Sequence, residues 1–312
     1  MIDPQNKKLL DELAAVGAPP LHTMKPADAR MGDGFMAALF RGGNQPEKVA
    51  AIENRAIPGP AGYIPIRIYR PEGPPVGALV FFHGGGFVLG SLESHDDVCR
   101  MLTNRSQAVV VAVDYRLAPE HKFPAAPEDC YAATRWVADN TATLGVPAGA
   151  IAVGGDSAGG NLAAVASLIA RDKGGPKIKF QLLIYPSTSA SADWPSVQEF
   201  KDAGYFINGN DMEWFHAHYI RDQADSVNPH AFPYNAPDLT GLPPALVITA
   251  GLDPLRDQGE AYAARLRDAG VATVLKRYED VTHVFVSMAP RLDKGREAIE
   301  ESAAAVRAAL EK

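Results

Sequence analysis

Short apolar runs alternate with helical patterns through the middle of the chain. Four runs rich in β-branched and aromatic residues lie between residues 76 and 186, and segments of helical periodicity separate them. Near-continuous apolar strands that alternate with helices are typical of a mostly parallel sheet covered on both faces. We therefore predict an α/β protein with strands at 78–86, 108–116, 150–157 and 179–187, and helices at 96–106, 127–140 and 158–172.

The same alternation resumes toward the C-terminus, and two further strands precede it. Residues 244–251 and 273–280 are strand-like, and a helical segment separates them. Residues 63–72 alternate apolar and polar side chains, which is typical of an antiparallel strand, and 49–59 is strand-like as well. The last helix, near 294–310, carries one apolar stripe opposite charges of both signs, so we expect it to face the core.

Two segments interrupt the alternation of strands and helices. Residues 1–45 begin with Asp3 and Pro4, a suitable cap and first position for a helix. Residues 188–240 are rich in aromatic side chains and are longer than a simple connection between strands requires. We predict that the two segments form a helical cap over one end of a sheet domain built from 46–187 and 241–312. The alternative, that both segments simply extend the core, stays open.

Composition and charge narrow the class of protein. Of the 312 residues, 46% are hydrophobic and 21% are charged, and the net charge of −7 argues against nucleic acid or an anionic membrane as a partner. The N-terminus lacks a signal-peptide pattern, and no apolar run approaches the ~18 residues of a spanning helix. We expect a cytoplasmic protein without a stable membrane anchor. The two cysteines, Cys99 and Cys130, lack disulfide-framework or metal-site spacing and are expected to be buried apolar residues.

A glycine-rich stretch at the end of one predicted strand carries candidate chemistry. Residues 155–159 read Gly-Asp-Ser-Ala-Gly, a G-x-S-x-G pattern between a strand and a helix. Such a turn lifts the Ser157 hydroxyl clear of the sheet and aims the N–H of Ala158 at the group that the serine attacks. Side chains at 155 and 159 would collide with adjoining elements, so both positions require glycine.

The turn lacks the residues that two other glycine-rich sites require. A phosphate-binding loop would need a lysine and a Ser or Thr after the last glycine, where Gly160 and Asn161 stand. The G-x-G-x-x-G spacing of a dinucleotide site is absent from 154–160. A purely structural glycine-rich turn stays open on this motif alone.

A second glycine-rich motif strengthens the serine interpretation. His83 and the three glycines that follow it stand at the end of the strand predicted at 78–86, directly after ALVFF, as in the loops that supply half of an oxyanion hole. Backbone N–H donors stabilise the negative charge that develops on a carbonyl oxygen when a nucleophile adds to it. We assign Gly84, Gly85 and Ala158 as these donors, and we expect His83 to hold the loop in place.

A serine at its ordinary pKa is a weak nucleophile, so a base and an acid that orients the base must accompany it. In this arrangement the chain order is serine, acid, histidine, each just past a strand. Asp253 and His283 satisfy the order, and Asp253 is favoured over Asp257 and Asp280. No metal site is expected, and no catalytic role is assigned to His22, His95, His121, His216 or His218.

These motifs together resemble the bacterial form of the hormone-sensitive-lipase-like family of alpha/beta-hydrolase carboxylesterases. The resemblance covers most of the chain from about residue 63, through FFHGGGFVLGS, GGDSAGGNLA, GLDPLRDQ and VTHVF. It implies an eight-stranded alpha/beta-hydrolase fold with a helical cap, a triad of Ser157, Asp253 and His283, and short- to medium-chain acyl esters as substrates. Val284 departs from the glycine that the family usually has after the histidine, which narrows the space beside the base.

The expected function is that of a serine carboxylesterase that forms an acyl-enzyme and needs no metal or organic cofactor. A hydrolase of amides, carbamates or formamides with the same triad is the alternative. A ligand receptor on the same scaffold is disfavoured because His283 is present. A homodimer through the sheet edge at 273–278 is a further expectation. Residues expected to line the substrate pocket are Phe87, Tyr185, Phe206, Trp214 and Val284.

Overall fold

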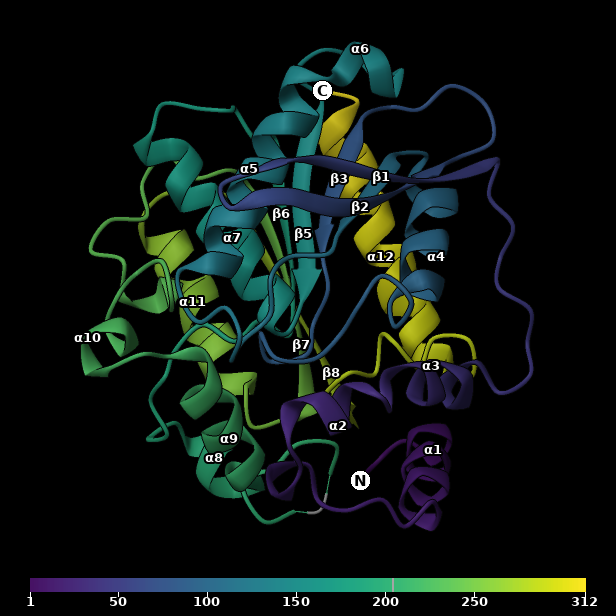
Figure 1. Ribbon diagram of the computed structural model, residues 1–312, viewed down its shortest axis with the longest axis vertical. Helices are drawn as coiled ribbons and strands as arrows, with labels where there is room; N and C mark the ends of the chain where they lie inside the picture. Colours follow the sequence, from purple (N-terminus) through teal and green to yellow (C-terminus); the bar gives the residue numbers. More distant parts are fainter. Residues whose placement is uncertain (204) are drawn as a thin grey trace.

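The computed structural model, which describes residues 1–203 and 205–312, contains the predicted eight-stranded, mostly parallel sheet (Figure 1). The strands follow the order β1-β2-β4-β3-β5-β6-β7-β8 across the sheet. The hairpin β1–β2 is antiparallel, β2 pairs antiparallel with β4, and every remaining pair is parallel. The bounds are β1 Ala51–Gly59, β2 Gly62–Arg70, β3 Ala78–Phe82, β4 Val109–Val113, β5 Ile151–Asp156, β6 Phe180–Ile184, β7 Ala245–Leu252 and β8 Thr273–Thr282.

Helices cover both faces of the sheet, as near-continuous apolar strands require. In β3, Val80 and Phe82 pack into one apolar cluster with α5, α7 and α11, whereas Leu79 and Phe81 pack into a second with α4 and α12. Figure 1 shows these two groups of helices on opposite sides of the strands. The bounds are α4 Asp96–Ser106, α5 Ala125–Asp139, α6 Thr141–Leu144, α7 Ala158–Asp172, α11 Arg256–Asp268 and α12 Asp293–Leu310.

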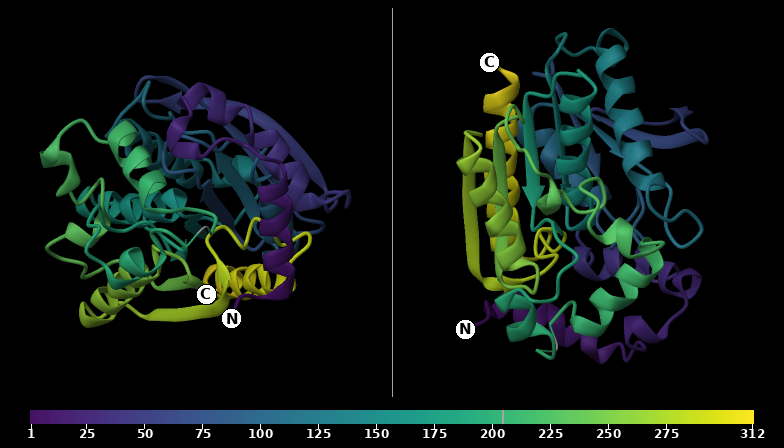
Figure 2. Two further views of the ribbon diagram at one scale, coloured as in Figure 1. Left: turned by 90° about the horizontal axis from the view of Figure 1, so that it is seen from below. Right: turned by 90° about the vertical axis from the view of Figure 1, so that its left-hand side faces the viewer.

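The two segments predicted to form a cap lie together at one end of the sheet (Figures 1 and 2). The His22 N–H donates to Asp211, and Trp214 Nε1 donates to the Met24 carbonyl at 3.2 Å, so side chains of the second segment hold the first. The division of the chain into a cap and a sheet domain stays a prediction. The elements are α1 Pro4–Ala15, η1 Leu21–Thr23, α2 Pro26–Arg30, α3 Asp33–Arg41, α8 Pro195–Phe200, α9 Gly209–Tyr219, α10 Gln223–Ser226 and η2 Pro233–Asn235.

The first helix begins where the sequence predicted. The Asp3 side chain accepts hydrogen bonds from the N–H groups of Gln5 and Asn6, and Pro4 occupies the first helical position. This pairing satisfies two of the N–H groups that a helix start leaves without a partner. The predicted cap at Asp3 is therefore confirmed. Among the residues that the structure describes, no helix combines the length and the apolar character needed to cross a membrane.

Strand ends differ from the sequence boundaries at three places that matter for the site. β3 ends at Phe82, four residues earlier than predicted, so His83 to Gly86 belong to a loop. β7 ends at Leu252 and β8 at Thr282, so Asp253 and His283 follow their strands directly. The candidate polar residues therefore lie together at the carboxyl ends of parallel strands, where loops converge.

Candidate active site

Ser157 occupies a strained turn between β5 and α7. Its φ of 56° and ψ of −118° lie outside the regions that non-glycine residues favour, and its N–H donates to the Ile184 carbonyl at 2.8 Å. A Cβ built at Gly155 would lie 2.3 Å from the Phe82 carbonyl oxygen, and one at Gly159 would lie 1.8 Å from it. The predicted need for glycine at both positions is confirmed, because no side chain fits between the turn and β3.

The Ser157 hydroxyl, the His283 ring and the Asp253 carboxylate form a continuous chain of contacts. Ser157 Oγ lies 2.9 Å from His283 Nε2, and His283 Nδ1 lies 2.7 Å from Asp253 Oδ2. Since an ionised carboxylate only accepts, Nδ1 carries the proton, and Nε2 is left to accept from the serine. All three side chains are buried, with exposed fractions of 8% for Ser157, 3% for His283 and 0% for Asp253.

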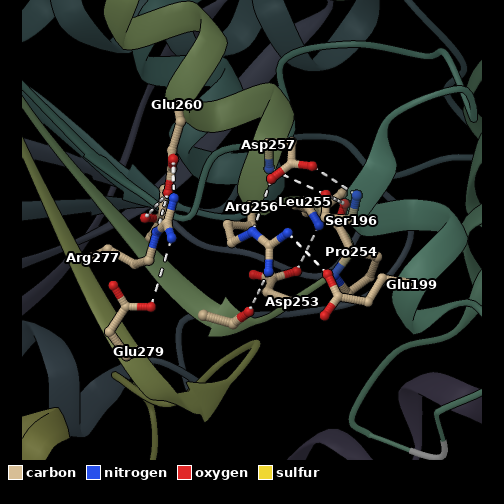
Figure 3. A network of polar contacts seen from close by, with 12 residues as sticks. Ser196, Glu199, Asp253, Pro254, Leu255, Arg256, Asp257, Glu260, Arg277 and Glu279 are labelled. Atoms are coloured by element: carbon tan, nitrogen blue, oxygen red, sulfur yellow. Dashed lines mark hydrogen bonds and ion pairs between the residues drawn. The ribbon is translucent and has the colours of Figure 1, made fainter.

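The backbone after β7 fixes the Asp253 carboxylate. Its Oδ1 accepts from the Leu255 N–H at 2.8 Å, which leaves Oδ2 for the histidine (Figure 3). Asp257, the nearby alternative, instead accepts from Arg256 and from the Ser196 N–H and so joins α11 to α8. Asp280 pairs with Lys294. Of the three aspartates considered from the sequence, only Asp253 contacts His283 among the described residues.

The surroundings of His283 require one correction to the predicted pocket. Tyr185 packs on the His283 ring with ring centroids 4.7 Å apart, but it is 1% exposed and does not line the cavity. Tyr185 therefore lies behind the imidazole, which it supports, and not at the cavity wall where it was predicted. Val284 does line the cavity, and its φ of 61° explains why glycine suits this position: a β-branched residue is strained in the left-handed region.

The glycine loop after β3 also departs from the prediction. The Gly84 N–H donates to Asp156 Oδ1 at 2.9 Å, so it is already occupied and unsuited to hold an oxyanion. Gly85 and Gly86 both line the cavity, and within the described part of the chain their N–H groups have no hydrogen-bond partner. Ala158 also lines the cavity and begins α7, where a helix leaves its first N–H groups free. The donor set that fits is Gly85, Gly86 and Ala158; Gly86 was missed, although it is the third glycine of the motif.

Glycine is required at both free donor positions. Gly85 has φ +117°, and a Cβ there would lie 2.2 Å from the Leu89 carbonyl oxygen. Gly86 has φ +59°, and a Cβ there would lie 2.1 Å from the Phe215 ring of α9. Both positions thus lack the space and the backbone freedom for any other residue, which keeps the two N–H groups at the cavity wall.

His83 holds the start of this loop, as predicted. Its ring stacks on Tyr115 with centroids 4.3 Å apart, and its Nδ1 lies 2.8 Å from the Gly84 carbonyl oxygen. Burial, together with the neighbouring His95, lowers the pKa of His83 to about 4. The ring is therefore neutral near pH 7 and lies outside the cavity wall.

A buried pair of His95 and Asp156 lies behind the loop, and the sequence analysis did not find it. His95 Nε2 is 3.1 Å from Asp156 Oδ1. Burial favours the neutral ring, but the Asp156 carboxylate outweighs burial and raises the pKa of His95. Burial likewise opposes the charge on Asp156, yet His95 and the Gly84 N–H lower its pKa. Asp156 stands inside the serine motif, but no spacing in the sequence connects it with His95.

An apolar cavity of about 940 Å³ opens above the serine. Phe87, Phe206 and Val284 line it as predicted. Trp214 does not line it, because its ring packs beside Phe215 and its Nε1 bonds the Met24 carbonyl; Phe215 faces the cavity in its place. Side chains of the N-terminal segment complete the wall, among them Leu10, Leu13, Leu21, Phe35, Met36 and Phe40.

This arrangement suits the addition of a hydroxyl to a carbonyl carbon. A hydroxyl within hydrogen-bond distance of a histidine that a carboxylate orients is the geometry of an activated nucleophile. Unoccupied backbone N–H groups at the same cavity wall supply donors for a developing oxyanion. The largely apolar walls accept hydrocarbon groups on either side of a carbonyl.

Comparison with known proteins agrees with this geometry. A family profile described as alpha/beta hydrolase fold matches residues 79–287. The chain is 45% identical to the carboxylic ester hydrolase LipN of Mycobacterium tuberculosis over 262 residues, which cover 81% of this chain and 69% of that protein. It is 46% identical to the hyperthermophilic esterase of the archaeon Pyrobaculum calidifontis, with a TM-score of 0.93 and 98% of each chain covered. An ester-hydrolase from the Lake Arreo metagenome, solved in complex with a bipyridine phosphonate derivative, is 43% identical with a TM-score of 0.93 over 99% of each chain.

Proposed function

This chain belongs to the hormone-sensitive-lipase-like carboxylesterases of the alpha/beta-hydrolase fold, and we propose that it hydrolyses short- to medium-chain acyl esters through an acyl-enzyme on Ser157. The observation that carries this proposal is the 2.9 Å contact between Ser157 Oγ and His283 Nε2 at the base of an apolar cavity. The names of its relatives, which are carboxylic ester hydrolases and esterases, support an ester rather than another acyl bond.

The first step forms the acyl-enzyme. His283 Nε2 takes the Ser157 proton as Oγ attacks the ester carbonyl carbon, and Asp253 stabilises the imidazolium that results. The carbonyl oxygen becomes an oxyanion, which the N–H groups of Gly85, Gly86 and Ala158 stabilise. Each such donor contributes about 10²–10³ in rate in enzymes of this kind. When the tetrahedral intermediate collapses, His283 returns the proton to the departing alkoxide, and the alcohol leaves.

The second step releases the acid. A water molecule takes the position that the alcohol vacated, and His283 Nε2 accepts its proton as the water oxygen attacks the acyl carbon. The same N–H donors stabilise the second oxyanion. Collapse of this intermediate breaks the bond to Ser157 Oγ, which regains its proton from the imidazolium, and the carboxylic acid is freed.

Chemical labelling and substitution test the proposal. An alkyl p-nitrophenyl phosphonate should modify the protein stoichiometrically at Ser157 and abolish hydrolysis of aryl esters. Ser157→Ala should lose labelling and lower ester turnover by about 10⁴ or more while the protein stays folded. Retained labelling in Ser157→Ala would place the nucleophile elsewhere.

A substrate panel separates the remaining alternatives. Matched aryl esters, anilides and carbamates with the same acyl group should show turnover of the esters far above that of the others. Equal or faster cleavage of an anilide would favour the amide hydrolase. Absence of turnover for every member, with tight binding retained, would favour a receptor. A cytoplasmic location and a dimer through the β8 edge remain predictions.

A further inference from the structure

The loop that carries the candidate oxyanion donors is held at both ends by carboxylates from distant parts of the chain. At its start, Asp156 of β5 accepts from the Gly84 N–H at 2.9 Å. At its end, Asp33 of α3 accepts from the Gly90 N–H at 3.1 Å. Gly85 and Gly86 lie between these two anchors and line the cavity. The first anchor belongs to the serine motif, whereas the second comes from the N-terminal segment.

The N-terminal segment also holds the loop through Arg30. Its Nε donates to the Val88 carbonyl at 2.8 Å, and its Nη2 donates to the Ala118 carbonyl at 2.6 Å. Arg30 ends α2 and Asp33 begins α3, so two side chains from one short stretch bond the second half of the loop. Within the loop, the Gly85 carbonyl accepts from the N–H groups of Val88 and Leu89, which closes a compact turn.

The two ends of the loop are packed against each other, so a movement of one reaches the other. Gly90 has φ +90°, and a Cβ there would lie 2.3 Å from the Gly84 carbonyl oxygen and 2.4 Å from His83 Nδ1. Gly90 thus lies directly against Gly84 and His83, so a shift of Gly90 toward them would displace the residues before Gly85. The hydrogen bond from the Gly90 N–H to Asp33 therefore helps to fix the positions of the N–H donors of Gly85 and Gly86.

We propose that Asp33 is a positioning residue for the transition state: through the Gly90 N–H it fixes the loop whose Gly85 and Gly86 N–H groups stabilise the oxyanion. The proposal rests on the esterase function proposed above. Donors to an oxyanion act when negative charge develops, so a displaced loop lowers kcat and leaves ground-state binding almost unchanged. A residue that only stabilised the segment would change the melting temperature without this split.

Three variants test the role. Asp33→Ala removes the acceptor and should lower kcat by about 10- to 100-fold, the scale of a displacement of up to 1 Å, with KM changed by less than about twofold. Asp33→Asn keeps an oxygen acceptor for the Gly90 N–H and should restore kcat to within about threefold of the original. Arg30→Gln, which loses contacts with the same loop, should lower kcat in the same direction.

A matched control lies elsewhere on the same segment. Glu12 of α1 forms a two-bond ion pair with Arg291 at 2.7 and 2.8 Å, and among the described residues it makes no hydrogen bond or ion pair with the loop. Glu12→Ala removes an anchor of the N-terminal segment, so it should lower the melting temperature slightly and leave kcat within about twofold.

An alkyl trifluoromethyl ketone, which forms a tetrahedral adduct with a serine, provides the second readout. Its inhibition constant should rise in Asp33→Ala by about the factor by which kcat falls. An unchanged kcat and inhibition constant in folded Asp33→Ala would overturn the proposal, as would an equal loss of kcat in Glu12→Ala. If Ser157→Ala keeps its activity, the esterase mechanism itself is wrong; if only Asp33→Ala does, the positioning role alone fails.

Discussion

Replacing Asp253 with asparagine tests the tautomer on which the proposed chemistry depends. Asp253 Oδ1 accepts from the Leu255 N–H at 2.8 Å, and Oδ2 faces His283 Nδ1 at 2.7 Å. Asparagine has nearly the same shape but only one acceptor oxygen. The Leu255 N–H will bind that oxygen, because the opposite orientation would set two donors against each other at a residue with no exposed surface. The amide NH₂ then faces Nδ1.

This orientation moves the histidine proton to the wrong nitrogen. With a donor facing Nδ1, the neutral ring carries its proton on Nε2, which points at Ser157 Oγ and no longer accepts. We expect Asp253→Asn to lower kcat by about 10⁴, which corresponds to about 5 kcal/mol of transition-state stabilisation. The melting temperature should change little, since the side-chain volume and the bond to Leu255 are kept.

The assay is the steady-state hydrolysis of an aryl acetate, followed by the absorbance of the released phenolate, with circular dichroism as the test of folding. Asp257→Asn is the matched control, because Asp257 lies four residues later and bonds Ser196 and Arg256 (Figure 3). In the described part of the chain, His283 Nδ1 bonds Asp253 and not Asp257. It should keep kcat within about threefold. The reasoning is refuted if folded Asp253→Asn retains a tenth or more of the original kcat, or if Asp257→Asn loses as much.

Two further predictions concern the residues around the triad. The pKa of His95 is raised from its ordinary 6.5, and the pKa of Asp156 is lowered from its ordinary 3.8. The pair therefore stabilises the fold most between pH 3.8 and pH 6.5. Its contribution falls at higher pH, where His95 loses its proton, and at lower pH, where Asp156 gains one. Asp156 and Asp33 are the carboxylates that face His95. His95→Gln should therefore lower the free energy of unfolding by about 3 kcal/mol at pH 6 and by clearly less at pH 9, as measured by urea denaturation. An equal loss of stability at both pH values would exclude a charged pair. Val284→Gly should relieve about 1–2 kcal/mol of backbone strain while losing a similar amount of burial and chain restriction, so the melting temperature should stay within about 5 °C. Removing the side chain beside the base should raise kcat/KM for branched esters about tenfold relative to a linear acetate, and a uniform change across the panel would contradict this role.

The order and type of the elements could be predicted from the sequence because local patterns encode them. The continuous apolar run of β3 and the alanine-rich character of α7 depend only on neighbouring residues, and all eight strands were found from such local patterns. The G-x-S-x-G turn could also be predicted from the sequence, because the steric need for Gly155 and Gly159 follows from the turn itself. Asp253 and His283 were found because strand ends in a parallel sheet share one edge.

The use of each polar group was decided only by the tertiary structure. The Gly84 N–H was predicted to be a free donor, but Asp156 occupies it, and nothing within the glycine motif shows which of three adjacent N–H groups a neighbouring carboxylate will take. Tyr185 and Trp214 were predicted to line the pocket, but packing places Tyr185 behind the imidazole and directs Trp214 toward Met24.

The contact between Asp33 and Gly90 joins residues that only the docking of the N-terminal segment brings together. Periodicity and motif spacing predict the local conformation of the segment to which a residue belongs. Which donor meets which acceptor depends on distances of a few tenths of an ångström between segments far apart in the chain, and only the packed structure sets these.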